Sequence, residues 1–194
     1  MRKFTLAAAA AAAAFVALPA YAQDEAPDGT RAFGIDPYVA VMGGWEQFDN
    51  EPNSAGIPQS ANRDARLDGS LVQGVVGFNV PLGPVFVGAE GNATKGISGD
   101  IDWEYGVAGR AGVRAGESGL IYGKVGYQWV NFDAFGKDSP DYHAMTYGLG
   151  FEVGPKDIGL GGITGNAGIR LRGEVSTFGD AHSLRPMAGL VAHF

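Results

Sequence analysis

Hydrophobic and polar residues alternate with a period of two along most of the chain from Ile35 onward. A period of two places successive side chains on opposite faces of an extended strand, whereas an amphipathic helix repeats its apolar positions every three or four residues. Clusters of Gly, Pro, Asn, Asp and Ser separate the alternating stretches, as turns between strands require. The pattern predicts eight strands, at 35–48, 69–80, 84–96, 101–115, 119–132, 142–154, 163–178 and 183–194.

Each predicted strand has one apolar face and one polar face. In the seventh strand, Ile169 and Leu171 share one face, and Arg170 and Arg172 share the other. Each run is also longer than ten residues, which exceeds the ~5–6 residues usual in soluble sheets and is enough for a tilted strand to cross a bilayer. The sequence therefore predicts an all-β fold, an eight-stranded antiparallel up-and-down transmembrane β-barrel.

The connections between these strands fall into two sets, one for each end of the barrel. The set at the end that holds both termini is 81–83, 116–118 and 155–162, and the opposite set is 49–68, 96–100, 133–141 and 179–182. The longest and most charged connection, 49–68, belongs to the second set. We expect this second end, called the loop end below, to carry the exposed surface of the protein.

The first residues are typical of a secretory signal peptide. Arg2 and Lys3 precede an Ala-rich apolar run, and Ala20 and Ala22 supply the small residues that signal peptidase cleavage needs. The run is too short for a membrane anchor and is followed at once by polar residues. The predicted organisation is a signal peptide at 1–22, a flexible leader at 23–34 and a barrel domain at 35–194.

The composition narrows the function classes. The chain has 194 residues, 45% of them hydrophobic and 18% charged, which is the length of one domain with enough apolar residues to fold. The absence of cysteine excludes disulfides, thiolate metal sites and a thiol nucleophile. The formal charge is −7, and it becomes −9 after loss of Arg2 and Lys3. This argues against a nucleic-acid partner, since binding phosphates requires clustered Lys and Arg.

Alternation alone does not say whether the apolar face points into the barrel or out of it. A soluble lipocalin-like carrier would point it inward, and Gly43-Gly44-Trp45 matches the G-x-W found near lipocalin starts. The polar faces, however, combine small residues with charges of both signs, which is how a narrow barrel fills its lumen. With the apolar face outward, the inner face would hold a charge network of Glu46, Glu90, Glu104, Arg110, Arg114, Lys124, Glu152, Arg170, Arg172, Glu174 and Arg185.

Aromatic residues near the strand ends also favour an apolar exterior. Trp45, Trp103, Tyr127, Trp129 and Phe132 lie close to the predicted loop end, where an aromatic girdle would meet the membrane interface. The chain stops on Phe194 at the end of a strand.

A signal sequence, eight strands and a last strand ending in Phe194 resemble the small outer-membrane β-barrels of Gram-negative bacteria, in the OmpA/OmpX/Opa-type porin-like family. The resemblance covers about 35–194, although Ala192 stands where the family often has a second aromatic residue. It implies a place in the outer membrane, contact with outer-membrane lipid and lipopolysaccharide, and recognition of Phe194 by the barrel-assembly machinery.

The search for catalytic chemistry finds little. Some barrels of this size modify lipid A with His and Ser two residues apart, but His182 and Ser183 are adjacent and point to opposite faces. His143 has no carboxylate placed by the sequence to orient it, and His193 lies at the terminal end. Loop carboxylates at 49–51 and 64–68 lack calcium-loop spacing. We expect no catalytic residue, cofactor or metal.

The predicted function is a structural or surface-interaction role, adhesin- or opacity-like, with a possible extracellular ligand bound through loop 49–68. A narrow porin-like channel for small solutes or ions is the alternative, since charged lumen residues can also line a pathway. A lipid A-modifying barrel enzyme and a soluble lipocalin-like carrier are weaker alternatives.

Overall fold

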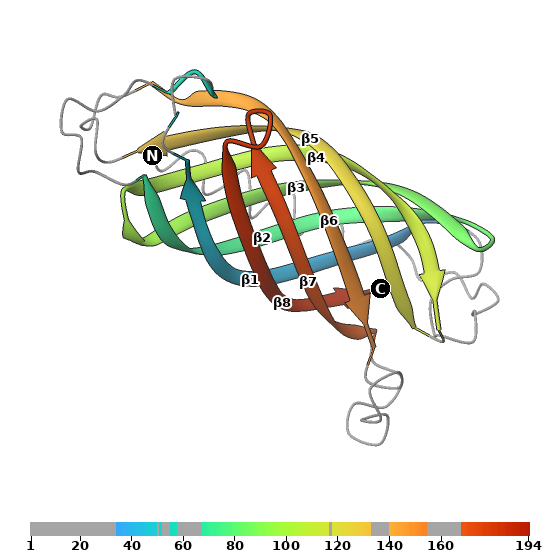
Figure 1. Ribbon diagram of the computed structural model, residues 1–194. Coiled ribbons are helices and arrows are strands. Elements are labelled where there is room, and N and C mark those ends of the chain that lie inside the picture. Colours follow the sequence, from blue (N-terminus) through green and yellow to red (C-terminus); the bar gives the residue numbers. More distant parts are fainter. Residues whose placement is uncertain are drawn as a thin grey trace.

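Eight strands wrap into one barrel in the computed structural model of the protein (Figure 1). The structure describes residues 34–49, 51, 55–57, 67–116, 118–132, 140–154 and 168–194. The predicted signal peptide and nearly all of the predicted leader lie outside these ranges. The strands are β1 Asp36–Phe48, β2 Asp68–Leu82, β3 Val85–Gly99, β4 Ile101–Ala115, β5 Gly119–Phe132, β6 Tyr142–Val153, β7 Ile169–Phe178 and β8 Ser183–His193.

Each strand pairs antiparallel with its neighbours in the sequence, and β8 pairs with β1 to close the barrel. The closing seam runs from Tyr38 opposite His193 to Phe48 opposite Ser183. Among the described strands, closure gives every strand a neighbour on both sides, whereas an open sheet would present an edge strand that a bilayer would not tolerate. The prediction of an eight-stranded antiparallel up-and-down barrel is confirmed.

Strand boundaries differ from the prediction in two places, and a third boundary is not tested. The segment 96–100, predicted as a loop, is strand as far as Gly99, and Asp100 alone separates β3 from β4. Gly99 adopts a φ of 89°, a left-handed conformation that glycine allows, so the chain reverses within very few residues. β2 similarly continues to Leu82 before a turn at Gly83. The predicted seventh strand began at 163, but residues 163–167 lie outside the described ranges.

The two faces of the barrel have the polarity of a membrane protein. Outward side chains are apolar and exposed, with Val41 66%, Leu149 73% and Leu190 55% accessible. Inward side chains include charged groups that are almost fully buried, such as Glu104 and Arg172. This is the reverse of a soluble barrel, so the prediction of an apolar exterior is confirmed and a lipocalin-like carrier is excluded.

Two glycines on the inner face make room for large rings in a narrow lumen. The Tyr38 ring lies over Gly77, and the Tyr122 ring lies over Gly150. A Cβ atom at either glycine would overlap the tyrosine ring. The small inward residues therefore hold the two tyrosines across the barrel, where they meet the charged groups.

The described part of the chain contains no helix that is long and apolar enough to cross a membrane.

Candidate functional site

The charged side chains of the lumen form the candidate site. All eleven predicted lumen charges lie on the inner face, contributed by seven of the eight strands. Nine of them are at most 5% exposed, the Lys124 side chain is 6% exposed, and Arg114 is half-buried near the terminal end. The strand register places nine of them at two heights, which we call the central cluster and the upper cluster, the upper one nearer the loop end. The other two, Arg114 and Arg170, lie nearer the terminal end, where they line a small pocket with Asp36 and Asn79.

Glu90 is the hub of the central cluster. Its carboxylate accepts hydrogen bonds from the Tyr38 hydroxyl at 2.7 Å, from Arg172 Nη2 at 2.8 Å and from Lys124 Nζ at 3.1 Å. Arg110 Nη1 lies 3.7 Å from the same carboxylate. A buried carboxylate is costly unless it is paired and hydrogen-bonded, and Glu90 meets both conditions.

Two further carboxylates complete the central cluster. Glu174 pairs with Lys124 at 2.5 Å and with Arg172 at 2.7 Å, and Glu152 pairs with Arg110 at 2.9 Å. The Arg110 guanidinium also lies 4.5 Å from the ring centres of both Tyr38 and Tyr122. Three cations and three carboxylates therefore share a compact volume across the barrel, and the aromatic faces add cation–π attraction.

The central cluster extends to the terminal end through His193. Its Nδ1 lies 2.9 Å from Asp36 and its Nε2 lies 2.8 Å from Glu152, so one imidazole joins β1, β6 and β8. A neutral imidazole has one N–H, whereas an imidazolium donates from both nitrogens. Asn79 also donates to Asp36 at 3.2 Å. The seam between the first and last strands is thus tied by a charged bridge.

The upper cluster contains two carboxylates and one guanidinium. Arg185 pairs with Glu104, which also accepts from Gln128 at 2.8 Å. The Ser183 hydroxyl donates to Glu46 at 2.7 Å. These groups come from β1, β4, β5 and β8 and span the lumen.

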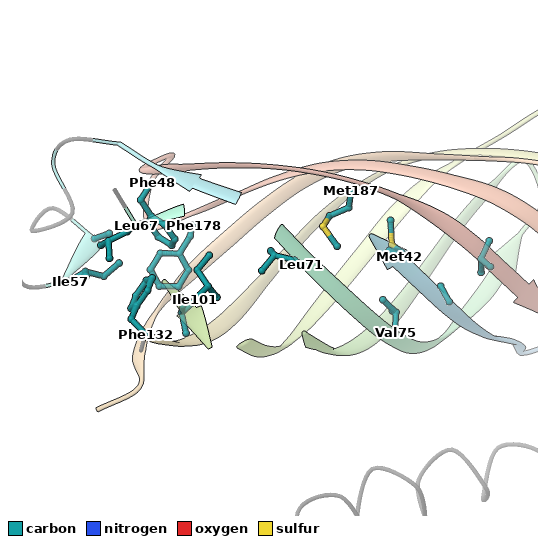
Figure 2. Close-up of a cluster of buried hydrophobic side chains, with 14 of the residues drawn as sticks. Met42, Phe48, Ile57, Leu67, Leu71, Val75, Ile101, Phe132, Phe178 and Met187 are labelled. Atoms are coloured by element: carbon teal, nitrogen blue, oxygen red, sulfur yellow. The ribbon is translucent and has the colours of Figure 1, made fainter. Parts of the chain in front are cut away.

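A group of buried apolar side chains, the mouth cluster, lies in the lumen at the loop end (Figure 2). The Phe48 ring meets Phe132 and Phe178 edge-on, with centres 5.4 and 5.8 Å away. Ile57 and Leu67, from the connection 49–68, are 0% and 7% exposed. The mouth cluster is the loop-end part of a larger buried apolar cluster that continues along the lumen through Leu71, Met42 and Met187. We include in it Phe48, Ala55, Ile57, Leu67, Ile101, Val130, Phe132 and Phe178.

The mouth cluster corrects two expectations. Phe132 was predicted in the outer girdle, but it lies inside the barrel because it has the same parity along β5 as Lys124 and Gln128. The connection 49–68 was expected to form exposed surface, which holds for the described Asp49 and Glu51, whereas Ala55, Ile57 and Leu67 are buried. Apolar side chains at a water-facing mouth gain more by covering the inward phenylalanines than by staying exposed.

The remaining predicted aromatic residues lie on the outer face. Trp45 and Trp103 are 39% and 48% exposed, and Tyr127 and Trp129 are partly exposed. The Phe194 side chain is 62% exposed, while its amide donates to the carbonyl of Pro37 at 3.0 Å and so pairs the chain end with β1.

Sequence reasoning missed several contacting groups. Tyr38 carries the same period-two signal as the lumen charges, so parity could have found it. Tyr122 shares the polar face of its strand with Lys124 and Gln128, as the alternation predicts. The outer-face contact of Asp141 with Tyr105, at 2.7 Å, had no signal, because the two residues are far apart in the chain.

The three histidines contact carboxylates or a tyrosine hydroxyl in the described structure. His182 Nδ1 lies 2.7 Å from Asp49 outside the lumen, whereas the neighbouring Ser183 faces Glu46 inside. His143 Nδ1 lies 2.5 Å from the Tyr127 hydroxyl. No group of three or more metal-ligating His, Cys, Asp or Glu side chains occurs among the described residues.

Strand number, closure and reversed polarity define the class of protein, an integral membrane β-barrel with a charge-filled lumen. The fold is that of the small Gram-negative outer-membrane barrels that the sequence resembles.

No protein-family model and no curated protein matches the chain by sequence. Several solved structures resemble the chain at low sequence identity. Ail, the attachment invasion locus protein of Yersinia pestis, is 15% identical to this chain with a TM-score of 0.49. The match covers 82% of this chain and 98% of the Ail chain. Neisserial surface protein A is 11% identical with a TM-score of 0.49, covering 83% and 99%. A de novo designed transmembrane β-barrel is 14% identical with a TM-score of 0.47, covering 85% and 99%.

Proposed function

We propose that the protein is an exported outer-membrane β-barrel that acts at the cell surface through its loop end and does not conduct. The observation that carries this proposal is the filled lumen, with two charged clusters below an apolar mouth. Eight strands enclose an interior just wide enough for side chains. The barrel then serves as a rigid anchor, and interactions fall to the residues beyond it.

Opening a pathway through this lumen would be expensive. Arg172, Glu90 and Arg110 are each paired with side-chain exposures of 0%, and leaving one such charge buried without its partner costs about 3–5 kcal/mol. A path would also expose the phenylalanines of the mouth cluster to water. Both costs favour a closed barrel over the porin-like alternative.

Conductance recording in planar bilayers tests the closed lumen. The full chain, purified from membranes, should give no stable conductance steps, with a general porin as the positive control for insertion. A double variant, Phe48→Ser with Phe178→Ser, removes two rings of the mouth cluster and checks whether that layer contributes to closure. Steady steps from the wild type, lowered or blocked by changing Arg172, would establish the channel instead.

Export and location are tested separately. After fractionation the protein should be found with the outer membrane, and the mature chain should have the mass of residues 23–194. An intact chain of full mass in the membrane would contradict cleavage after Ala22. Recovery in the soluble periplasmic fraction would contradict the membrane location.

The surface role and the absence of catalysis need their own measurements. Replacing 58–66 by a Gly-Ser segment keeps Ile57 and Leu67 for the mouth cluster while removing Arg63, Asp64 and Arg66. Cells carrying this variant should bind extracellular-matrix proteins and sulfated glycans less than cells carrying the wild type. The mass spectrum of lipid A should not change on expression, and a shift would reveal an enzyme.

A further inference from the structure

A groove crosses the outer face of the barrel from β2 to β6. Its volume is about 670 Å³, within the ~300–1,000 Å³ that ligand sites usually have. The strand register shows why it is hollow, because Gly91 has no side chain and its nearest neighbour on the same face of β3 is the small Ala89. One cross-strand row runs along the groove: Val76, Gly91, Val107, Tyr127 and Met145.

The next row toward the loop end is aromatic and polar. The Tyr105 and Trp129 rings stack with centres 5.3 Å apart, and Trp129 is the cross-strand partner of His143. The Asp141 carboxylate accepts hydrogen bonds from the Tyr105 hydroxyl at 2.7 Å and from the Asn131 amide at 3.0 Å. We call these residues the platform. Tyr127 belongs to the groove and also contacts His143, so groove and platform are continuous.

We propose that the groove and the platform together bind one glycolipid of the outer leaflet, an inference that rests on the proposed membrane location. An acyl chain lies in the groove and the sugar headgroup lies on the platform. Sugar rings present C–H faces that pack on aromatic rings, and their hydroxyls donate to a carboxylate such as that of Asp141.

Charge on the platform favours a sugar over a phosphate as the recognised group. Asp141 brings a negative charge, and a phosphate would be repelled by it. The Lys95 ammonium on β3 is paired with Asp102 and lies over the Trp103 ring. An uncharged sugar satisfies the hydrogen-bonding groups of the platform without this repulsion.

The position of the groove favours a lipid over a second copy of the chain. Val107 and Val125, which line it, are 58% and 47% exposed within the apolar band that meets hydrocarbon. An amphiphile has an apolar tail and a polar head, and the surface here changes from apolar to polar along the same strands in that order.

Native mass spectrometry of the full chain in detergent tests the proposal. The probes are monogalactosyl diacylglycerol, diacylglycerol and phosphatidylglycerol with identical acyl chains. The wild type should retain the galactolipid at least fivefold more than either of the other lipids. Gly91→Leu should lower this retention at least fivefold by filling the groove, whereas Gly43→Leu on β1 should leave it unchanged.

These two glycines are matched, because an added Cβ would lie 3.8 Å from the nearest atom at Gly91 and 3.9 Å at Gly43. Asp141→Ala should abolish the preference for the sugar without changing diacylglycerol retention. Folding of each variant is checked by heat-modifiable gel mobility, and Ala89→Leu replaces Gly91→Leu if that variant does not fold.

Equal retention of the three lipids by the wild type would overturn the proposal, and so would full retention by the groove variants. A dimer that dissociates in Gly91→Leu would assign the groove to a second copy. Because binding is measured in detergent, its failure is distinct from a failure of outer-membrane fractionation.

Discussion

Arg172→Ala should destabilise the barrel far more than Leu171→Ala, although the two residues are neighbours on β7. The Arg172 side chain is 0% exposed in the lumen, and Leu171 is 49% exposed on the outer face. Loss of the guanidinium removes the 2.8 Å pair with Glu90 and the 2.7 Å pair with Glu174. Both carboxylates then stay buried with fewer donors.

The expected magnitude follows from the partners that remain. Glu90 keeps Lys124 and Tyr38, and Glu174 keeps Lys124 and the Tyr122 hydroxyl. The loss should therefore fall near the lower end of the ~3–5 kcal/mol seen when a buried pair is broken. Leu171→Ala should cost about 1 kcal/mol or less, because lipid chains as apolar as leucine fill the space it leaves.

Reversible urea unfolding in phospholipid vesicles, followed by tryptophan fluorescence, measures both losses. Adding Glu174→Gln to Arg172→Met removes one charge of each sign, and the double variant should recover part of the stability lost in Arg172→Met alone. A larger loss for Leu171→Ala than for Arg172→Ala would refute the reasoning, since that order belongs to a barrel with an apolar core.

Two further predictions concern the last strand. His193→Asn should lower the free energy of unfolding by about 1–3 kcal/mol, because Asp36 and Glu152 lose a shared donor but keep Asn79 and Arg110 respectively. The control His143→Asn, on the outer face, should change it by at most about 0.5 kcal/mol. Equal effects of the two variants in urea unfolding would contradict the bridge. Deleting Phe194 should reduce the amount of folded protein in cell membranes far more than the yield of refolding in detergent, because assembly in cells would depend on the terminal aromatic residue. Heat-modifiable gel mobility measures the folded fraction in both samples. An equal loss in the two samples would mean that Phe194 only packs against its neighbours.

The period-two pattern was sufficient to predict the strands and their two faces, because each strand is solvated differently on its two sides. Ile169 and Leu171 meet hydrocarbon while Arg170 and Arg172 meet other charges, so the physical requirement repeats at every second residue. Ends of strands were less predictable. Whether 96–100 is loop or strand depends on how far β2 and β3 stay paired, and their register shifts between Ser70 and Leu71.

The pairing of the lumen charges could not be derived from the sequence. Arg172 and Glu90 are 82 residues apart, and nothing in either segment says that β3 and β7 bring them to the same height. That height is set by the stagger of strands around the closed barrel, which is a property of all eight pairings together. Parity assigns a residue to the lumen, and closure then selects its partner.

The mouth cluster shows that parity carries more information than proximity to a strand end. Phe132 lies near the outer aromatic residues in the sequence, but its even spacing from Lys124 and Gln128 assigns it to the lumen. Phe48 has the same relation to Glu46, and Phe178 to Glu174. Three phenylalanines thus face inward at one end, where water would otherwise reach them. Ile57 and Leu67 are the only large aliphatic residues of the connection 49–68, so burial against those rings is the favourable place for them.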